Sequence, residues 1–104
     1  MRLYYSDQQR ERGYFVAACL SLYDHQCFFE STKTLTEVLR IYGNCLGMNP
    51  YTIKLRRDSY DRIVPNRRKG WKDAIITTQM KSILEEARRL GREAAIARCR
   101  AWLV

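Results

Sequence analysis

The segment between residues 34 and 50 most constrains the fold, because its signals end one helix and begin another within a few residues. Thr34-Leu-Thr-Glu37 has the pattern of a capping box, in which the threonine and glutamate side chains satisfy each other's backbone amides. Gly47 can adopt the left-handed conformation that ends a helix, and Asn49-Pro50 supplies an N-cap followed by proline at the first helical position. The spacing predicts a helix over 34–46, a turn at Gly47 and a second helix over 49–62, which together form a helix-turn-helix.

The apolar spacing around this turn is consistent with two packed helices. Small Gly43 would let the second helix approach closely. Arg56 departs from the pattern, because it stands three residues after Ile53, where an apolar residue is usual. Either Leu55 or Tyr60 replaces it in the core, or the second helix is rotated. The residues expected to face the core here are Leu35, Val38, Leu39, Tyr42, Leu46, Met48, Ile53, Tyr60 and Ile63.

Three further helices are predicted from apolar residues at helical spacing, over 8–23, 77–90 and 92–103. The segments 24–33 and 64–73 have the composition of loops, and only 73–78 could extend locally as a strand. The chain of 104 residues is 46% apolar and 12% aromatic, enough for one packed core but short for two. We therefore expect an all-α bundle of about five helices in a single domain spanning 1–104.

Each of these three helices is expected to bury one face. The residues expected to face the core are Phe15, Ala18, Cys19, Leu22 and Tyr23 in the helix over 8–23, Met80, Ile83, Leu84, Ala87 and Leu90 in the helix over 77–90, and Ala95, Cys99, Trp102 and Leu103 in the helix over 92–103.

The positive charge is concentrated in one part of the chain. The net charge is +8, yet residues 1–53 contain five basic and five acidic side chains, whereas residues 54–72 contain eight basic and two acidic ones. Such a density repels itself and favours a polyanionic partner, although a solvated basic face with no partner is the alternative. Together with the helix-turn-helix, the charge favours binding to double-stranded DNA.

In the usual docking, the second helix presents its N-terminal residues and outer face to the major groove. Lys54 and Arg57 can donate to guanine, and Asn49 suits adenine, although its capping role is the favoured one. Asp58 is expected to orient Arg57 or Arg62, and acceptance of a hydrogen bond from cytosine is the alternative. The predicted DNA-binding residues are Asn49, Tyr51, Thr52, Lys54, Leu55, Arg56, Arg57 and Arg62 on the helix and Arg67, Arg68, Lys69 and Lys72 in the basic loop 65–72.

Two kinds of contact are expected from that loop. Arg67, Arg68 and Lys69 are suited to phosphates, which set affinity and register rather than sequence preference. Trp71 could stack on a base or pack against a sugar, but the favoured interpretation is that it anchors the loop onto the core.

Three stretches resemble the small helix-turn-helix DNA-binding domain of restriction-type and phage-defence proteins: Leu46-Gly-Met-Asn-Pro-Tyr-Thr-Ile-Lys54, Arg57-Asp-Ser-Tyr-Asp61 and Pro65-Asn-Arg-Arg-Lys-Gly-Trp71. The similarity covers about a quarter of the chain, within residues 46–71. It implies DNA binding through the second helix and the following loop, in a regulator of transcription or a targeting subunit of a defence or phage system. In such proteins a nuclease or ATPase module follows this domain, and the sequence departs from them by having none, so a stand-alone regulator, a recruited subunit and an excised domain all stay open.

Enzymatic activity is not expected, and neither are cofactors or metals. Cys19, Cys27, Cys45 and Cys99 contain no C-x-x-C pair for zinc, and Cys19 and Cys99 lie on apolar stripes as reduced core residues. His25 could pair with Cys27 as a nucleophile, but a solvated loop histidine is favoured. Glu85 and Glu86 are expected to pair with Arg88 and Arg89 on the helix surface.

The alternative function is a helical protein–protein interaction module whose basic face docks on an acidic surface of a larger partner. A homodimer fits either function. The sequence has no apolar run of about eighteen residues and no N-terminal apolar stretch, so we expect a cytoplasmic protein without membrane contact.

Overall fold

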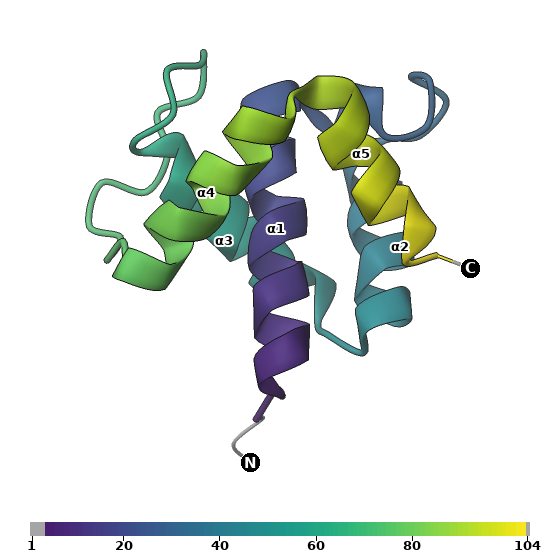
Figure 1. The fold of residues 1–104 in the computed structure, drawn as a ribbon, viewed down its shortest axis with the longest axis horizontal. Helices are drawn as coiled ribbons and strands as arrows, with labels where there is room; N and C mark the ends of the chain where they lie inside the picture. Colours follow the sequence, from purple (N-terminus) through teal and green to yellow (C-terminus); the bar gives the residue numbers. More distant parts are fainter. Residues whose placement is uncertain (1–3, 104) are drawn as a thin grey trace.

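The computed structural model describes residues 4–103 and is all-helical over that range, as predicted (Figure 1). Its elements are α1 (Asp7–Tyr23), a short 3₁₀ helix η1 (His25–Cys27), α2 (Leu35–Leu46), α3 (Pro50–Asp61), α4 (Thr78–Leu90) and α5 (Arg92–Ala101). No strand occurs among these residues, and the segment 73–78 that could have extended leads directly into α4. None of the described helices is long and apolar enough to cross a membrane.

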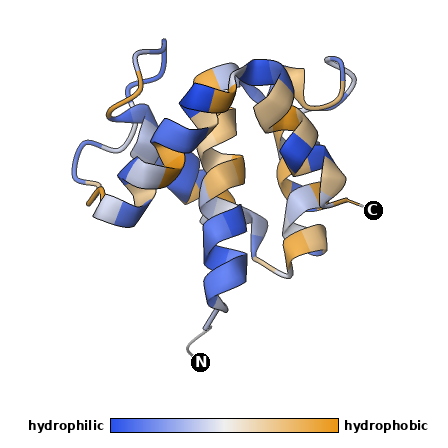
Figure 2. Ribbon diagram, viewed as in Figure 1, coloured by the Kyte–Doolittle hydropathy of each residue, from blue (hydrophilic) through white to orange (hydrophobic). Residues whose placement is uncertain are grey.

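The central element is α1, which contacts each of the other four α-helices. Its residues from Gly13 to Ser21 are all buried, whereas its first turns are hydrophilic (Figure 2). The expectation of one buried face was therefore wrong for this helix. A helix has a single buried stripe when its neighbours cover only one side, whereas α1 is covered on several sides.

The helix pair α2–α3 has the predicted turn. Thr34 and Glu37 form the capping box, with the Glu37 amide donating to the Thr34 hydroxyl at 3.2 Å and the Thr34 amide donating to the Glu37 carboxylate at 3.0 Å. Gly47 ends α2 in the left-handed conformation at φ 68°, and the Asn49 side chain caps α3 by accepting from the Tyr51 amide at 2.9 Å. The second helix begins at the expected residue and ends at Asp61, one residue earlier than predicted.

A close approach at Gly43 sets the geometry of this pair. A Cβ atom at this position would lie 2.8 Å from both the Met48 carbonyl oxygen and Cγ of Pro50. Only glycine therefore lets the start of α3 lie this close to the end of α2.

The core side of α3 is formed by Ile53 and Tyr60, both fully buried. Ile63 was predicted to join them, but it lies beyond the end of the helix and is 40% exposed, while Val64 takes the buried place. Arg56 stands where an apolar residue was expected, and its guanidinium lies 5.2 Å from the centre of the Tyr14 ring. The side chain thus packs against an aromatic ring and keeps its charge through a cation–π contact.

The last two helices complete the core. Met80, Leu84 and Ala87 of α4 and Ala95 and Cys99 of α5 are buried, as predicted, whereas Ile83, Leu90, Trp102 and Leu103 are only partly buried. α5 ends at Ala101, and Trp102 beyond it packs edge-on against Phe15 with ring centres 5.7 Å apart. Cys19 and Cys99 are buried in the core, as predicted, and their sulfur atoms lie 3.9 Å apart without a disulfide between them.

Candidate nucleic-acid interface

The basic loop, residues 65–72, folds back on the C-terminal half of α3. Gly70 has φ +73°, and a Cβ atom there would lie 2.6 Å from the Arg62 amide nitrogen and 2.7 Å from the Asp61 carbonyl carbon. The Trp71 amide donates to the Asp58 carbonyl at 2.9 Å. The backbone of the loop is thus pressed against α3 at the two residues that precede its last lysine.

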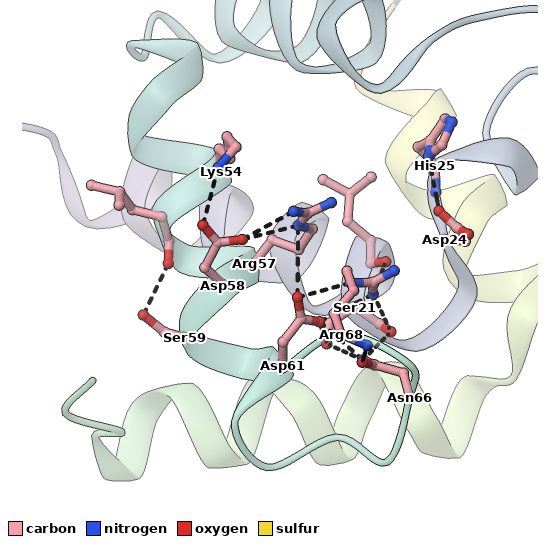
Figure 3. A network of polar contacts seen from close by, with 12 residues as sticks. Ser21, Asp24, His25, Lys54, Arg57, Asp58, Ser59, Asp61, Asn66 and Arg68 are labelled. Carbon is pink, nitrogen blue, oxygen red and sulfur yellow. Dashed lines mark hydrogen bonds and ion pairs between the residues drawn. The ribbon is translucent and has the colours of Figure 1, made fainter. Parts of the chain in front are cut away.

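A buried carboxylate, Asp61, holds the other end of the loop (Figure 3). Its side chain is 1% exposed and accepts from Ser21 Oγ at 2.7 Å, from Asn66 Nδ2 at 2.9 Å and from Arg68 Nε at 2.8 Å. Arg68 also donates to the carbonyls of Leu20 and Ser21, at 3.2 and 3.0 Å. This network ties α1, α3 and the loop together, so the loop is positioned by the core.

The protonation states in this network follow from its geometry. Burial alone would raise the pKa of Asp61, but hydrogen bonds from Arg68, Ser21 and Asn66 and the positive charge of Arg68 outweigh burial and lower it below its ordinary value. The same hydrogen bond raises the pKa of Arg68. Asp61 and Arg68 therefore form a charged pair throughout the neutral range.

A second carboxylate, Asp58, organises the middle of α3. It accepts from Lys54 Nζ at 3.2 Å and from Arg57 Nη2 at 3.0 Å, which confirms that it orients a neighbouring arginine (Figure 3). The arginine is Arg57 and not Arg62, whose guanidinium donates to the Ala74 carbonyl at 2.6 Å. Arg57 is largely covered, with 12% of its side chain exposed.

The structure thus divides the predicted DNA-binding residues into two groups. Lys54, Arg57 and Arg68 are paired with carboxylates of α3, and Arg68 acts inside the protein to hold the loop. The exposed residues are Asn49, Tyr51, Arg62, Arg67, Lys69 and Lys72, and the half-buried ones are Thr52, Leu55 and Arg56. Within residues 4–103, the acidic side chains form no ion pair with Arg67, Lys69 or Lys72.

Trp71 does not anchor the loop onto the core, and that prediction was wrong. Trp71 is 48% exposed, and the loop is held instead through Gly70, Asn66 and Arg68. Sequence reasoning also missed Ser21 and Asn66 as members of the site. Asn66 follows a proline in the basic segment and could have been suspected, but Ser21 lies 40 residues from Asp61 in the sequence and gave no signal.

A hollow of about 610 Å³ lies between α3 and the basic loop. Its apolar lining comes from Tyr51 and Leu55 on the helix and Trp71 on the loop. The polar lining consists of two arginines and the two aspartates paired with them, Arg57, Arg68, Asp58 and Asp61. We call this feature the α3–loop hollow.

The other reactive side chains considered in the sequence do not come together into a catalytic or metal site in the described part of the chain. Cys27 Sγ donates to the Tyr23 carbonyl at 2.7 Å and His25 Nδ1 lies 2.8 Å from Asp24 Oδ1, so each group is engaged with a different partner. No group of three or more histidine, cysteine or acidic side chains among residues 4–103 could hold a metal ion. Glu85 pairs with Arg88 at 2.6 Å as predicted, while Glu86 lies 2.9 Å from Arg98 and 4.0 Å from Arg89.

No protein-family profile, curated protein or solved structure matches this chain.

Proposed function

We propose that this protein binds double-stranded DNA, with α3 in the major groove and the basic loop on the phosphate backbone. The observation that supports this most is the combination of a helix-turn-helix with a loop, held by Asp61 and Arg68, whose exposed cations have no carboxylate partner within residues 4–103. Cations that the fold leaves unpaired are available to replace the counterions of a polyanion.

Within this proposal the residues have separate roles. Tyr51, Thr52, Lys54 and Leu55 reach base edges from the first turns of α3. Arg62, Arg67, Lys69 and Lys72 contact phosphates and set the register of the helix on the duplex. Asn49 and Arg68 act indirectly, Asn49 by capping α3 and Arg68 by holding the loop against Asp61.

The biological role follows from the partial resemblance of residues 46–71. We extend the proposal to a transcription regulator or a targeting subunit that brings an effector to DNA in a defence or phage system.

The salt dependence of duplex binding tests the proposal. With about four phosphate contacts, affinity for a labelled duplex should fall on the order of 100-fold between 50 and 200 mM salt. Fluorescence anisotropy across this range gives the slope directly. Absence of duplex binding at 50 mM salt would overturn the proposal.

Charge-reversed variants locate the surface. Arg67→Glu with Lys69→Glu should weaken binding to all duplex sequences alike and flatten the salt slope by about two phosphates. Arg92→Glu with Arg100→Glu makes the same change in net charge on α5, at exposed positions outside the interface, and should weaken binding far less. An equal loss of duplex affinity in the two double variants would show that binding depends on the net charge of the protein and not on a defined interface.

A second candidate function is a protein-docking module, favoured by the exposed apolar groups Tyr51, Trp71 and Ile75, which are 61%, 48% and 82% exposed. Aromatic side chains of this kind are enriched at protein interfaces. A partner recovered by cross-linking at these residues, with no salt-sensitive duplex complex, would favour this candidate. A tight duplex complex with no partner would count against it, and sedimentation of the free protein reports whether a homodimer forms.

A further inference from the structure

Two exposed aromatic side chains line the α3–loop hollow from opposite elements. Tyr51 stands on the first turn of α3 and Trp71 stands in the basic loop, and both border the same space of about 610 Å³. Tryptophan side chains are mostly buried in folded proteins, yet about half of the surface of Trp71 is exposed to solvent.

The position of Trp71 is fixed by its backbone. The Trp71 amide donates to the Asp58 carbonyl, and the preceding Gly70 lies so close to residues 61 and 62 that no side chain would fit there. The loop therefore holds the indole beside α3 without burying it. With the backbone held, stacking of a flat ligand has to order only the two side-chain torsions of the tryptophan, which costs little conformational entropy.

The rest of the hollow suits a polar aromatic ligand. Arg57 and Asp58, which are paired with each other, form a polar edge along the side of α3, and Leu55 adds an apolar contact one turn after Tyr51. Outside the hollow, Arg67, Lys69 and Lys72 are exposed on the same loop. Stacking rings, hydrogen-bonding groups and flanking cations are together what an unstacked nucleotide requires.

We propose that the α3–loop hollow receives one unpaired base of a nucleic acid strand, stacked on Trp71, while the flanking cations contact its phosphates. This inference rests on the proposed DNA binding and narrows the substrate to duplexes that carry an unpaired or flipped-out nucleotide. The lining of the hollow is itself neutral, because Arg57 and Arg68 are paired with Asp58 and Asp61. The exposed cations of the adjoining loop, Arg67, Lys69 and Lys72, favour a nucleotide over a protein side chain.

Three DNA hairpins of one stem sequence test this proposal by anisotropy at a fixed salt concentration. The first is fully paired, the second carries one extrahelical nucleotide, and the third carries an abasic residue at the same place and so keeps the phosphate but lacks the base. We expect the extrahelical nucleotide to bind about 5- to 150-fold more tightly than its abasic counterpart, the range for stacking of one base on an aromatic ring.

Variants assign that preference to the hollow. Trp71→Ala should abolish the difference between base and abasic hairpins while keeping the salt-dependent affinity for the abasic one. Ile75→Ala removes an even more exposed apolar side chain four residues away and should leave the preference unchanged. Unchanged thermal melting confirms that both variants are folded.

The outcomes separate the two proposals. Equal binding of the base and abasic hairpins, or a base preference that survives in Trp71→Ala, overturns the nucleotide site while the binding of duplex DNA stands. Failure of all three hairpins to bind at low salt overturns both.

Discussion

Asp61 shows how one residue determines the shape of the proposed interface. Its carboxylate lies at 1% exposure between α1, α3 and the basic loop and receives three side-chain donors. A buried carboxylate without such donors would be strongly unfavourable, so the site depends on all of them at once. Arg68, which the sequence suggested as a phosphate contact, is used inside the protein for this reason.

The lowered pKa of Asp61 predicts a specific pH dependence. A carboxylate with a lower pKa in the folded than in the unfolded state stabilises the fold above its unfolded pKa of about 3.9. That stabilisation is lost as the pH falls through the folded-state pKa. Urea denaturation at pH 7 and pH 3 should show the loss, and Asp61→Asn should show less of it.

At pH 7 we expect Asp61→Asn to lower the free energy of unfolding by about 1.5–3 kcal/mol, because it removes charge-assisted hydrogen bonds. Glu85→Gln, at an exposed ion pair on α4, is the control and should change stability by less than about 1 kcal/mol. Equal effects of the two substitutions would show that burial of the pair adds nothing.

Two buried tyrosines, Tyr42 and Tyr60, should respond differently to loss of the hydroxyl. Tyr60 donates to the Met80 carbonyl at 2.8 Å, whereas Tyr42 Oη has no hydrogen-bond partner within the described residues. Tyr60→Phe should cost about 1 kcal/mol, and Tyr42→Phe should be neutral or stabilising, since it removes an unsatisfied buried group. Chemical denaturation of both variants checks this, and a cost for Tyr42→Phe as large as that for Tyr60→Phe would contradict it.

At the scale of the elements, helix ends were predictable and lateral packing was not. The signals at Thr34, Gly47 and Asn49 act on the backbone of neighbouring residues, so the bounds of α2 and the start of α3 could be found from the sequence. A second capping box, formed by Ser6 and Gln9 at the start of α1, has the same local signature and was missed. Ile63 was misplaced because the chain after Asp61 no longer follows the helical spacing, and it turns Val64 instead of Ile63 toward the core.

The contact between α2 and α3 can be tested by two glycine substitutions. A Cβ at Gly43 would meet the Met48 carbonyl and the Pro50 ring, both rigid, whereas a Cβ at Gly13 would meet only the flexible end of the Met48 side chain, 2.8 Å away. Both glycines are helical, so alanine gains about the same helix propensity at each. We expect Gly43→Ala to be less stable than Gly13→Ala by about 1–3 kcal/mol in thermal or chemical denaturation.

Duplex binding of the same variants tests the orientation of α3. Gly43→Ala should weaken binding by moving the start of α3, while Gly13→Ala should leave it near that of the original protein. Equal stability and binding in both variants would show that the close approach is unimportant.

At the scale of the whole molecule, α1 is the scaffold on which the other helices pack. Ala17 and Ala18 are both fully buried on this helix, and their small side chains allow neighbours to approach from different sides. The interface is coupled to the same helix, because Ser21 and the carbonyls of residues 20 and 21 hold Asp61 and Arg68.

Because α1 is covered on several sides, we expect a larger side chain at any of its buried positions to destabilise the fold. Ala17→Leu should lower the free energy of unfolding by about 1–3 kcal/mol through overpacking, although position 17 lies outside the predicted apolar stripe. Ala97→Leu, at an exposed position of α5, should be close to neutral. Denaturation midpoints measure both, and a neutral Ala17→Leu would mean that this side of α1 is not packed.

The sequence alone determined the helical class, the turn between α2 and α3, and the segment in which the excess charge lies, because capping, helical spacing and charge density are local properties. Only the tertiary structure decided that α1 is buried on several sides, that Arg68 holds the loop and that Trp71 faces a hollow. These features depend on contacts between residues far apart in the chain, such as Ser21 and Asp61, and local patterns contain no information about such contacts.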